Sequence, residues 1–321
     1  MNTSVKLQSR VRQYLRERRH LGFQLRNMGL CLNSFTNYIS QRQHSGKLTA
    51  DLMADWAQHN CGGMNDRYSW ARRLMILRPF MRWLQQFEPS TEVPDEAIFG
   101  KIKGRTTPHI YQEQELVDLL NAAHQLTPLL RGATYEALFG LLSATGMRQS
   151  EAIHLCNADV DLKAGILTIR RTKFAKSRQV PIHPSTIDAL KQYRRIRDQW
   201  VTNVGENPFF VGTRGQRLGQ ELSTRQVDRI FEALRVQLAW TNRGTHTTPR
   251  VHDLRHTFVV RRILAWQEEG KDIDQAMLGL STYVGHAKVT HTYWYLTAVP
   301  ELMALASARF EFHLLPEVHH A

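Results

Sequence analysis

Cysteine and long apolar runs are scarce in this sequence of 321 residues, and both absences exclude classes of protein. The three cysteines, Cys31, Cys61 and Cys156, are odd in number and far apart, and no two have metal-site spacing. Such a set argues against a disulfide framework and favours a reducing compartment. No uncharged stretch is long enough to span a membrane, and the first residues contain no apolar run suited to a signal peptide. These absences predict a cytoplasmic protein that has no membrane partner.

Phosphate-binding loops and repeats are also missing. The sequence contains no glycine–lysine pattern of the P-loop type, no tandem repeat and no low-complexity tract. Hydrophobic residues still make up 42% of the chain, which is enough for a substantial core. We therefore expect an ordered globular protein that does not use a P-loop nucleotide site.

Acidic residues are few relative to basic ones. The chain has 42 Lys and Arg against 29 Asp and Glu, a net charge of +13, and a pI near 10.0. Residues 1–105 hold 17 of the basic and only 8 of the acidic residues. An excess of positive charge of this size favours a polyanionic partner, most often nucleic acid, which we expect the first third of the chain to bind.

The hydrophobic pattern predicts a mainly α-helical protein of two domains. Residues 1–90 indicate a bundle of about four helices, with Thr49 as a cap of the third. Pro89, Pro94 and Pro108 mark a linker over residues 91–110. Residues 111–321 predict a second, mostly helical domain with a small β-sheet. Its hairpin pairs residues 166–169 with 179–182 around a basic turn, residues 208–211 suggest a further short strand, and residues 300–314 a last apolar helix.

Two stretches of the second domain have the composition of a phosphate-chemistry site. His252 and Arg255 are three residues apart and share one helix face, and His286 is followed nine residues later by Tyr295. Arginine binds phosphate oxygens with two donors, histidine moves protons near neutral pH, and a tyrosine hydroxyl can form a covalent intermediate. Upstream, Arg148 is expected in the first turn of a helix, where backbone N–H groups favour an anion.

Four blocks of residues together resemble the tyrosine recombinase (phage integrase) family. In chain order they are Thr145-Gly146-Met147-Arg148-Gln149-Ser150-Glu151, the hairpin with Lys173 and Arg178-Gln179-Val180-Pro181-Ile182, His252-Asp253-Leu254-Arg255-His256, and Gly285-His286 with Tyr295. Each block alone is weak, but their order and spacing form a strong signal. The resemblance implies a helical core-binding domain and a catalytic domain that breaks and rejoins DNA.

The resemblance also implies a role for each matched residue. Tyr295 would attack the scissile phosphate and form a 3′-phosphotyrosyl link, while Arg148, Arg255 and His286 stabilise the transition-state charge. His252 would assist proton transfer at Tyr295, and Lys173 would protonate the leaving 5′-oxygen. Glu151 would be a structural partner of Arg148. No metal or cofactor is implied, and the phosphotyrosyl link would make ATP unnecessary.

Rival residues and rival functions remain open at this point. Tyr293 competes with Tyr295 as the nucleophile, and Lys176 competes with Lys173 as the acid. The four-residue spacing of His252 and His256 also suits a metal site, so a metal-dependent phosphohydrolase is an alternative; the resemblance instead favours His256 as a helper in a metal-free site. A protein that only binds DNA and a relaxing enzyme of the type IB topoisomerase kind are two further alternatives.

The expected partner is double-stranded DNA, bound by a homotetramer on paired recombination sites. Exchange would pass through a four-way junction, and residues 300–314 would either dock on a neighbouring protomer or pack on their own core. The absence of an additional arm-binding domain favours the recombinase of a mobile element, acting on nucleoid DNA.

Overall fold

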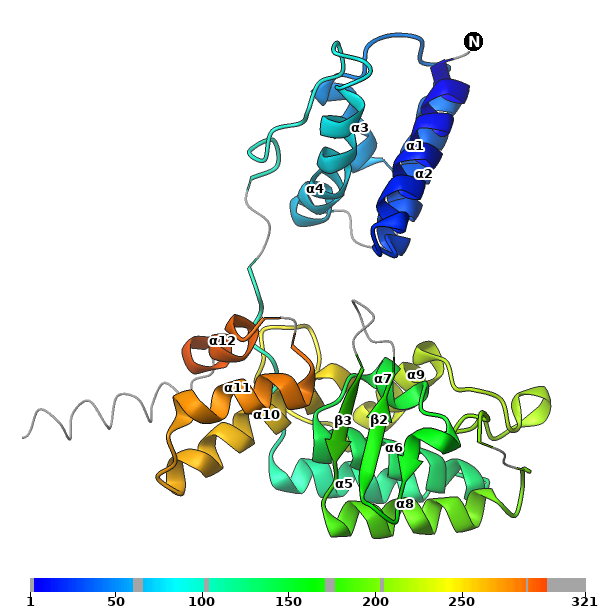
Figure 1. Ribbon diagram of the computed structural model, residues 1–321, viewed down its shortest axis with the longest axis vertical. Helices are drawn as coiled ribbons and strands as arrows, with labels where there is room; N and C mark the ends of the chain where they lie inside the picture. Colours follow the sequence, from blue (N-terminus) through cyan, green and yellow to red (C-terminus); the bar gives the residue numbers. More distant parts are fainter. Residues whose placement is uncertain are drawn as a thin grey trace, which may run out of the picture. The chain divides into compact units, whose positions relative to one another are not determined.

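The computed structural model describes residues 3–59, 66–100, 104–170, 177–202, 205–286 and 288–298. Lys173, Lys176 and the helix expected over residues 300–314 lie outside them. The chain divides into two compact units, residues 1–105 and residues 106–321. None of the described helices is long and apolar enough to cross a membrane. The helices and the small sheet confirm the predicted mainly α fold class (Figure 1).

The described part of the first unit consists of four helices around one apolar core. They are α1 (Thr3–His20), α2 (Arg26–Gln41), α3 (Ala50–Gln58) and α4 (Arg67–Leu84). Leu32, Phe35 and Ile39 of α2 are fully buried, as the apolar spacing of this helix predicts, but Leu30, which was expected on the same apolar side, is 71% exposed. Thr49 caps α3 by accepting a hydrogen bond from the Leu52 N–H at 3.3 Å, which confirms the predicted cap.

The segment expected as a linker is divided between the two units. Glu92 pairs with the first unit: its backbone N–H donates to Leu48 O, and its carboxylate accepts from the Ala50 N–H. Thr107 O, by contrast, accepts from the Thr245 N–H in the second unit. The prolines therefore mark irregular chain, much of which packs on its neighbouring unit.

The second unit contains most of the regular structure. Its helices are α5 (Glu113–His124), α6 (Leu129–Thr145), α7 (Gln149–Ile153), α8 (Pro184–Arg197), α9 (Thr224–Leu238), α10 (Val251–Glu268), α11 (Ile273–Val284) and α12 (Thr290–Ala298), with short 3-10 turns η1 (Asn157–Asp159) and η2 (Gly215–Arg217). Its strands are β1 (Val160–Asp161), β2 (Ile166–Ile169) and β3 (Arg178–Pro181). They form an antiparallel sheet in chain order, with Leu167 opposite Val180 (Figure 1).

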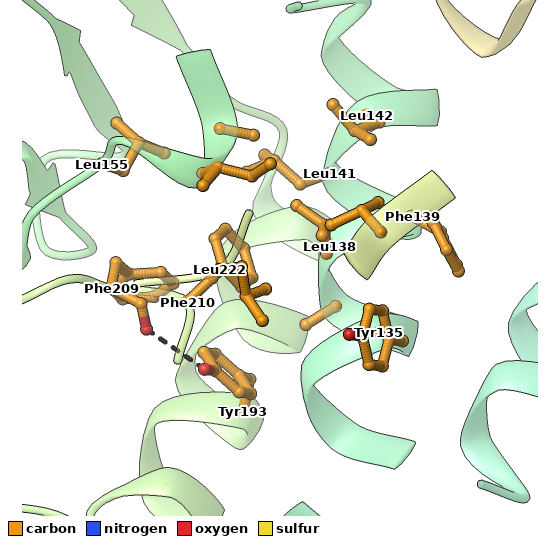
Figure 2. Close-up of a cluster of buried hydrophobic side chains, with 14 of the residues drawn as sticks. Tyr135, Leu138, Phe139, Leu141, Leu142, Leu155, Tyr193, Phe209, Phe210 and Leu222 are labelled. Atoms are coloured by element: carbon orange, nitrogen blue, oxygen red, sulfur yellow. Dashed lines mark hydrogen bonds between the residues drawn. The ribbon is translucent and has the colours of Figure 1, made fainter. Parts of the chain in front are cut away.

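The core of the second unit has two parts, which together position the site. Helix α6 is buried around most of its circumference, and Figure 2 shows Leu138 and Leu141 of this helix near Phe209 and Phe210. Tyr193 Oη donates to Phe209 O at 3.1 Å, which anchors that loop (Figure 2). Residues 208–211, expected as a strand, contribute only isolated bridges. A separate cluster joins α10, α11 and α12 and includes Tyr295.

Candidate active site

The turn between α6 and α7 brings Arg148 into the site. Gly146 ends α6 with a φ of +59°, and a Cβ at this position would lie 2.5 Å from Phe258 Cδ1. Only glycine combines that left-handed backbone with so close a neighbour. Arg148 then precedes α7 as its N-cap residue, one position before the first turn in which it was expected.

Glu151 and a helix end hold the half-buried Arg148 side chain. Its Nη1 donates to Glu151 Oε1 at 2.7 Å, and its Nη2 donates to Gly285 O at 2.7 Å. The Glu151 carboxylate also accepts from the Arg148 backbone N–H at 2.9 Å. This agrees with the predicted structural role of Glu151, and it fixes the guanidinium against the end of α11.

Arg178 contacts the same carboxylate from the sheet. Its Nη1 and Nη2 donate to the two oxygens of Glu151 at 3.1 and 2.8 Å, and its Nε donates to Tyr283 O at 2.8 Å. Burial acts to raise the pKa of Glu151, but the hydrogen bond and charge of Arg178, with the Arg148 contacts, lower it below its usual range. Arg178 was part of the matched hairpin block, but no role had been predicted for it.

Arg255 is the most deeply buried cation of the site. It is 3% exposed, and its Nη1 donates to Gly146 O and to Val284 O, both at 2.7 Å. Its buried Nη2 has no hydrogen-bond partner among the described residues. Burial and the nearby charge of Arg148 lower its pKa to about 10. An anion between the two arginines would supply the missing acceptor.

Gly285 and His286 follow the end of α11. Gly285 has a φ of +73°, and a Cβ there would lie 2.5 Å from Nη1 of Arg178. His286 Nδ1 hydrogen-bonds to Thr292 Oγ1 at 2.7 Å, and its ring stacks on Tyr295 with centroids 6.4 Å apart. The histidine therefore lies between the arginine-bearing turn and α12.

Tyr295 is buried, and its hydroxyl points toward α10. The side chain is 2% exposed, and Oη lies 2.6 Å from Nδ1 of His256. Tyr293, the rival nucleophile, donates instead to Asp274 Oδ1 at 2.9 Å, and this hydrogen bond raises the pKa of Tyr293. The two hydroxyls thus face different surroundings, and that of Tyr295 lies among the cations of the site.

His252 lies one helical turn before His256 on α10. The residue is partly open to solvent, but burial of its titrating group and the charges of Arg255 and Arg250 lower its pKa to about 4. The rings of His252 and His256 meet edge to face, 4.9 Å apart. Both histidines are therefore held in the neutral form near pH 7.

Five of the six expected site residues meet in one region, while Lys173 lies outside the described residues. Arg148, Arg255, His286 and Tyr295 are connected through the ends of α6 and α11 and through α12, with His252 beside them on α10. From the sequence, His256 was expected only to assist the other site residues. Nothing in the local pattern shows that its side chain contacts a tyrosine 39 residues later in the chain. Across the described residues, no cluster of three or more His, Cys, Asp or Glu could hold a metal ion.

Comparisons with known proteins identify this arrangement. A sequence model of the phage integrase family matches residues 110–301, which is more than half of the chain. The putative integrase/recombinase y4rB of Sinorhizobium fredii is 36% identical over 306 residues, covering 94% of this chain and 96% of that protein. Tyrosine recombinase XerC of Chromobacterium violaceum is 28% identical over 259 residues, covering 81% and 79%.

Solved structures show the same fold. The Tn1549 transposon integrase in complex with transposon right end DNA has a TM-score of 0.64 at 16% identity, covering 94% of this chain and 99% of that one. The XerH site-specific recombinase bound to difH substrate has a TM-score of 0.62 at 19% identity, covering 95% and 84%. With the family match and the relative from Sinorhizobium fredii, the chain belongs to the phage integrase family of tyrosine recombinases.

Proposed function

We propose that the chain cleaves and rejoins duplex DNA at specific sites, with Tyr295 as the nucleophile on the scissile phosphate. The observation that carries this proposal is the buried Nη2 of Arg255, which has no acceptor among the described residues and belongs to the cation group around Tyr295. A buried donor without a partner is costly unless a ligand satisfies it. A phosphodiester oxygen supplies both the acceptor and the negative charge.

The arginines, His286 and Tyr295 each take one part of the reaction, and His252 is proposed to assist proton transfer at Tyr295. Arg148 and Arg255 bind the non-bridging oxygens, on which charge grows in the transition state, and His286 adds a hydrogen bond. Tyr295 Oη forms the bond to phosphorus as the bond to the 5′-oxygen breaks. The resulting 3′-phosphotyrosyl link conserves the energy of the phosphodiester, so the reverse attack by a 5′-hydroxyl needs no ATP.

Lys173 is proposed as the acid that protonates the leaving 5′-oxygen. It precedes Arg178 by five residues, and Arg178 contacts the site through Glu151 and the carbonyl of Tyr283. Lys176 is the alternative acid, and Lys173→Ala and Lys176→Ala distinguish the two by which one slows cleavage.

The DNA partner is proposed from the charge of the chain and from the fold. The relatives of known structure include recombinases bound to DNA, and basic side chains on α1 and α4 of this chain are exposed, including Arg12, Arg72 and Arg82. We assign residues 1–90 as a core-binding domain and residues 111–321 as the catalytic domain, joined through residues 91–110. Joining two sites requires several protomers, and we propose a homotetramer that serves a mobile element on nucleoid DNA in the cytoplasm.

Covalent capture tests the chemistry. The protein is incubated with a pool of randomised duplexes that carry a nick, so that the released strand diffuses away and the phosphotyrosyl adduct accumulates. We expect a protein–DNA adduct that survives denaturant. Sequencing the captured DNA then identifies the recognition site. Tyr295→Phe should abolish the adduct, whereas the matched variant Tyr293→Phe should retain it.

The other outcomes separate the alternatives. An adduct lost in Tyr293→Phe and kept in Tyr295→Phe reverses the choice of nucleophile. Cleavage that stops in excess chelator indicates a metal-dependent phosphohydrolase, and binding with no adduct on any duplex indicates a DNA-binding protein. An enzyme that relaxes supercoils but never joins two different DNA molecules is of the topoisomerase kind.

A further inference from the structure

The hydroxyl of Tyr295 has a specific partner on another helix. His256 Nδ1 on α10 lies 2.6 Å from Tyr295 Oη on α12, and the centroids of the two rings are 5.5 Å apart. This separation is short for a hydrogen bond between oxygen and nitrogen. Tyr295 is 2% exposed, so bulk water does not replace this contact.

The surroundings of His256 keep its ring neutral. Burial is the largest cause, and the electrostatic effects of His252 and Arg255 on its own helix, of Arg250 just before that helix and of His286 after α11 act in the same direction, lowering its pKa to about 2. A neutral imidazole has one nitrogen that accepts and one that donates. Because an un-ionised phenol is the better donor, the contact is written as Tyr295 O–H donating to Nδ1, with the imidazole proton on Nε2.

We propose that His256 is a further catalytic residue, which accepts the hydroxyl proton of Tyr295 as this oxygen attacks the scissile phosphate. The inference rests on the proposed function, since it assigns a partner to the nucleophile named there. The Oη–H bond breaks, its proton moves to Nδ1 and leaves an imidazolium, and the freed oxygen lone pair forms the O–P bond. The bond to the 5′-oxygen breaks at the other side of phosphorus, where a separate acid supplies a proton.

A weak base is sufficient for this step. A free phenol has a pKa of about 10, but its proton becomes strongly acidic as the oxygen bonds to phosphorus. The acceptor must therefore be in place and unprotonated, and both conditions hold for His256. The imidazolium lies near the phosphate, whose negative charge offsets that of Arg255 and Arg250. The return of the proton to Tyr295 in the rejoining step follows the same path.

The test measures single-turnover cleavage of the DNA site identified by capture, in two substrates that differ in their leaving group. His256→Asn keeps a polar atom near the place of Nδ1 but cannot take up a proton, and His256→Ala removes the group; thermal unfolding reports whether each variant folds. One substrate carries the natural 5′-hydroxyl leaving group and the other a p-nitrophenyl ester, which leaves without an acid. We expect both variants to bind DNA as the wild type does and to cleave both substrates roughly 100-fold more slowly.

Lys173→Ala is the matched control. Loss of the acid should slow cleavage of the natural substrate but not of the p-nitrophenyl substrate, whose leaving group needs no proton. A second readout is kcat/KM between pH 5 and pH 8. A base whose pKa is lowered stays unprotonated as the pH falls, so the wild-type rate should show no decrease at the ordinary histidine pKa of about 6.5.

Three results would overturn the role. They are a folded His256→Asn that cleaves at the wild-type rate, a His256 defect that the p-nitrophenyl substrate repairs, and a wild-type rate that falls through pH 6.5. A wild-type protein that forms no adduct overturns the proposed function itself. Failure of the inference alone therefore leaves wild-type cleavage intact.

Discussion

Arg255 has two functions, one structural and one in binding an anion, that a lysine could not perform together. Nη1 of its guanidinium donates to the carbonyls at the ends of α6 and α11, and Nη2 lacks a partner among the described residues. A planar guanidinium serves both directions at once, whereas an ammonium is a single point charge. The residue therefore joins the structure of the site to its chemistry, and a test must separate these two contributions.

Arg255→Lys should slow cleavage by roughly 100-fold or more, the usual effect of removing one transition-state donor. Affinity for the captured site should change far less, because many phosphate contacts share the binding energy. The matched control is Arg261→Lys on the same helix, whose guanidinium donates to Tyr111 O and to no other described residue. Single-turnover rates and gel-shift affinities give the comparison; an unchanged cleavage rate in Arg255→Lys would contradict the assignment.

Glu151 is a buried carboxylate whose stabilising effect depends on pH. Since its folded-state pKa is lowered, its contribution is present above the unfolded pKa and is lost as the pH falls through the folded value. Glu151→Gln leaves Arg148 and Arg178 without their counter-charge and should lower the free energy of unfolding by about 3 kcal/mol at pH 7. The difference from wild type should begin to shrink as the pH falls below the unfolded-state pKa of about 4.3, and it should be lost as the pH falls further through the lower folded-state pKa.

Denaturant titrations at pH 7 and at acidic pH measure both effects. Glu232→Gln is the control, because that carboxylate is exposed and its ion pair with Arg235 is 3.7 Å long. A loss for Glu151→Gln that is equally large at both pH values would show that packing, rather than charge, is the cause.

At the scale of elements, the end of α11 decides where three arginines lie. Arg148 and Arg178 bind carbonyls of residues 283–285, and Arg255 binds Val284 O. The glycine at position 285 permits this, because its φ is +73° and a Cβ would collide with Arg178. Helix α11 therefore positions the site through its backbone more than through its side chains.

Two alanine substitutions in and after α11 test this role of the helix end. Gly285→Ala should cost roughly 1–3 kcal/mol of stability through backbone strain and should also slow cleavage, because it displaces Arg178. Gly279→Ala, at an open position within α11, should instead stabilise the protein by up to about 1 kcal/mol and leave cleavage unchanged. Thermal unfolding and cleavage rates measure both, and equal effects of the two would argue against a special helix end.

Periodicity predicted the long elements and missed the shortest strand. The apolar spacing of α4 and the strand pair β2–β3 were visible in the sequence, because a side chain every third or fourth residue, or every second, must face the core. Strand β1 has two residues, which are too few for a period to develop, whereas the five-residue helix α7 was expected from the helix end at Gly146 and not from a period. The contact of His256 with Tyr295 depends on how α10 packs on α12, so no local pattern could contain it.

The candidate site was predictable for a different reason. Arg148, Arg255, His286 and Tyr295 were found through the order of family motifs, and the structure brings them together from three separate segments. The motifs did not predict the contacts that hold these residues in place. The paired hydrogen bonds of Arg178 to Glu151 and the carbonyls at the end of α11 depend on tertiary packing. The motifs contain the reacting groups, whereas the residues that position these groups are spread over the whole fold.

At the scale of the whole molecule, positive charge is separated from the chemistry. Residues 1–105 carry most of the net charge, although the candidate active-site residues all lie beyond them. A division of this kind predicts that affinity and catalysis respond to different substitutions. Exposed arginines of the first unit should govern how DNA binding depends on salt, whereas the buried arginines of the second should govern cleavage.

Arg72→Gln on α4 tests this separation. Arg72 is exposed, and each phosphate contact releases counterions, so its loss should weaken binding to all duplexes alike and reduce the slope of log affinity against log salt by about 1. Cleavage at saturating protein should stay at the wild-type rate. Arg42→Gln is the matched control, since Arg42 pairs with Asp55 and packs over Tyr38 within its own unit. An unchanged salt slope in Arg72→Gln, or a slower cleavage step at saturation, would show that the face of α4 bearing Arg72 does not serve as a phosphate-binding surface.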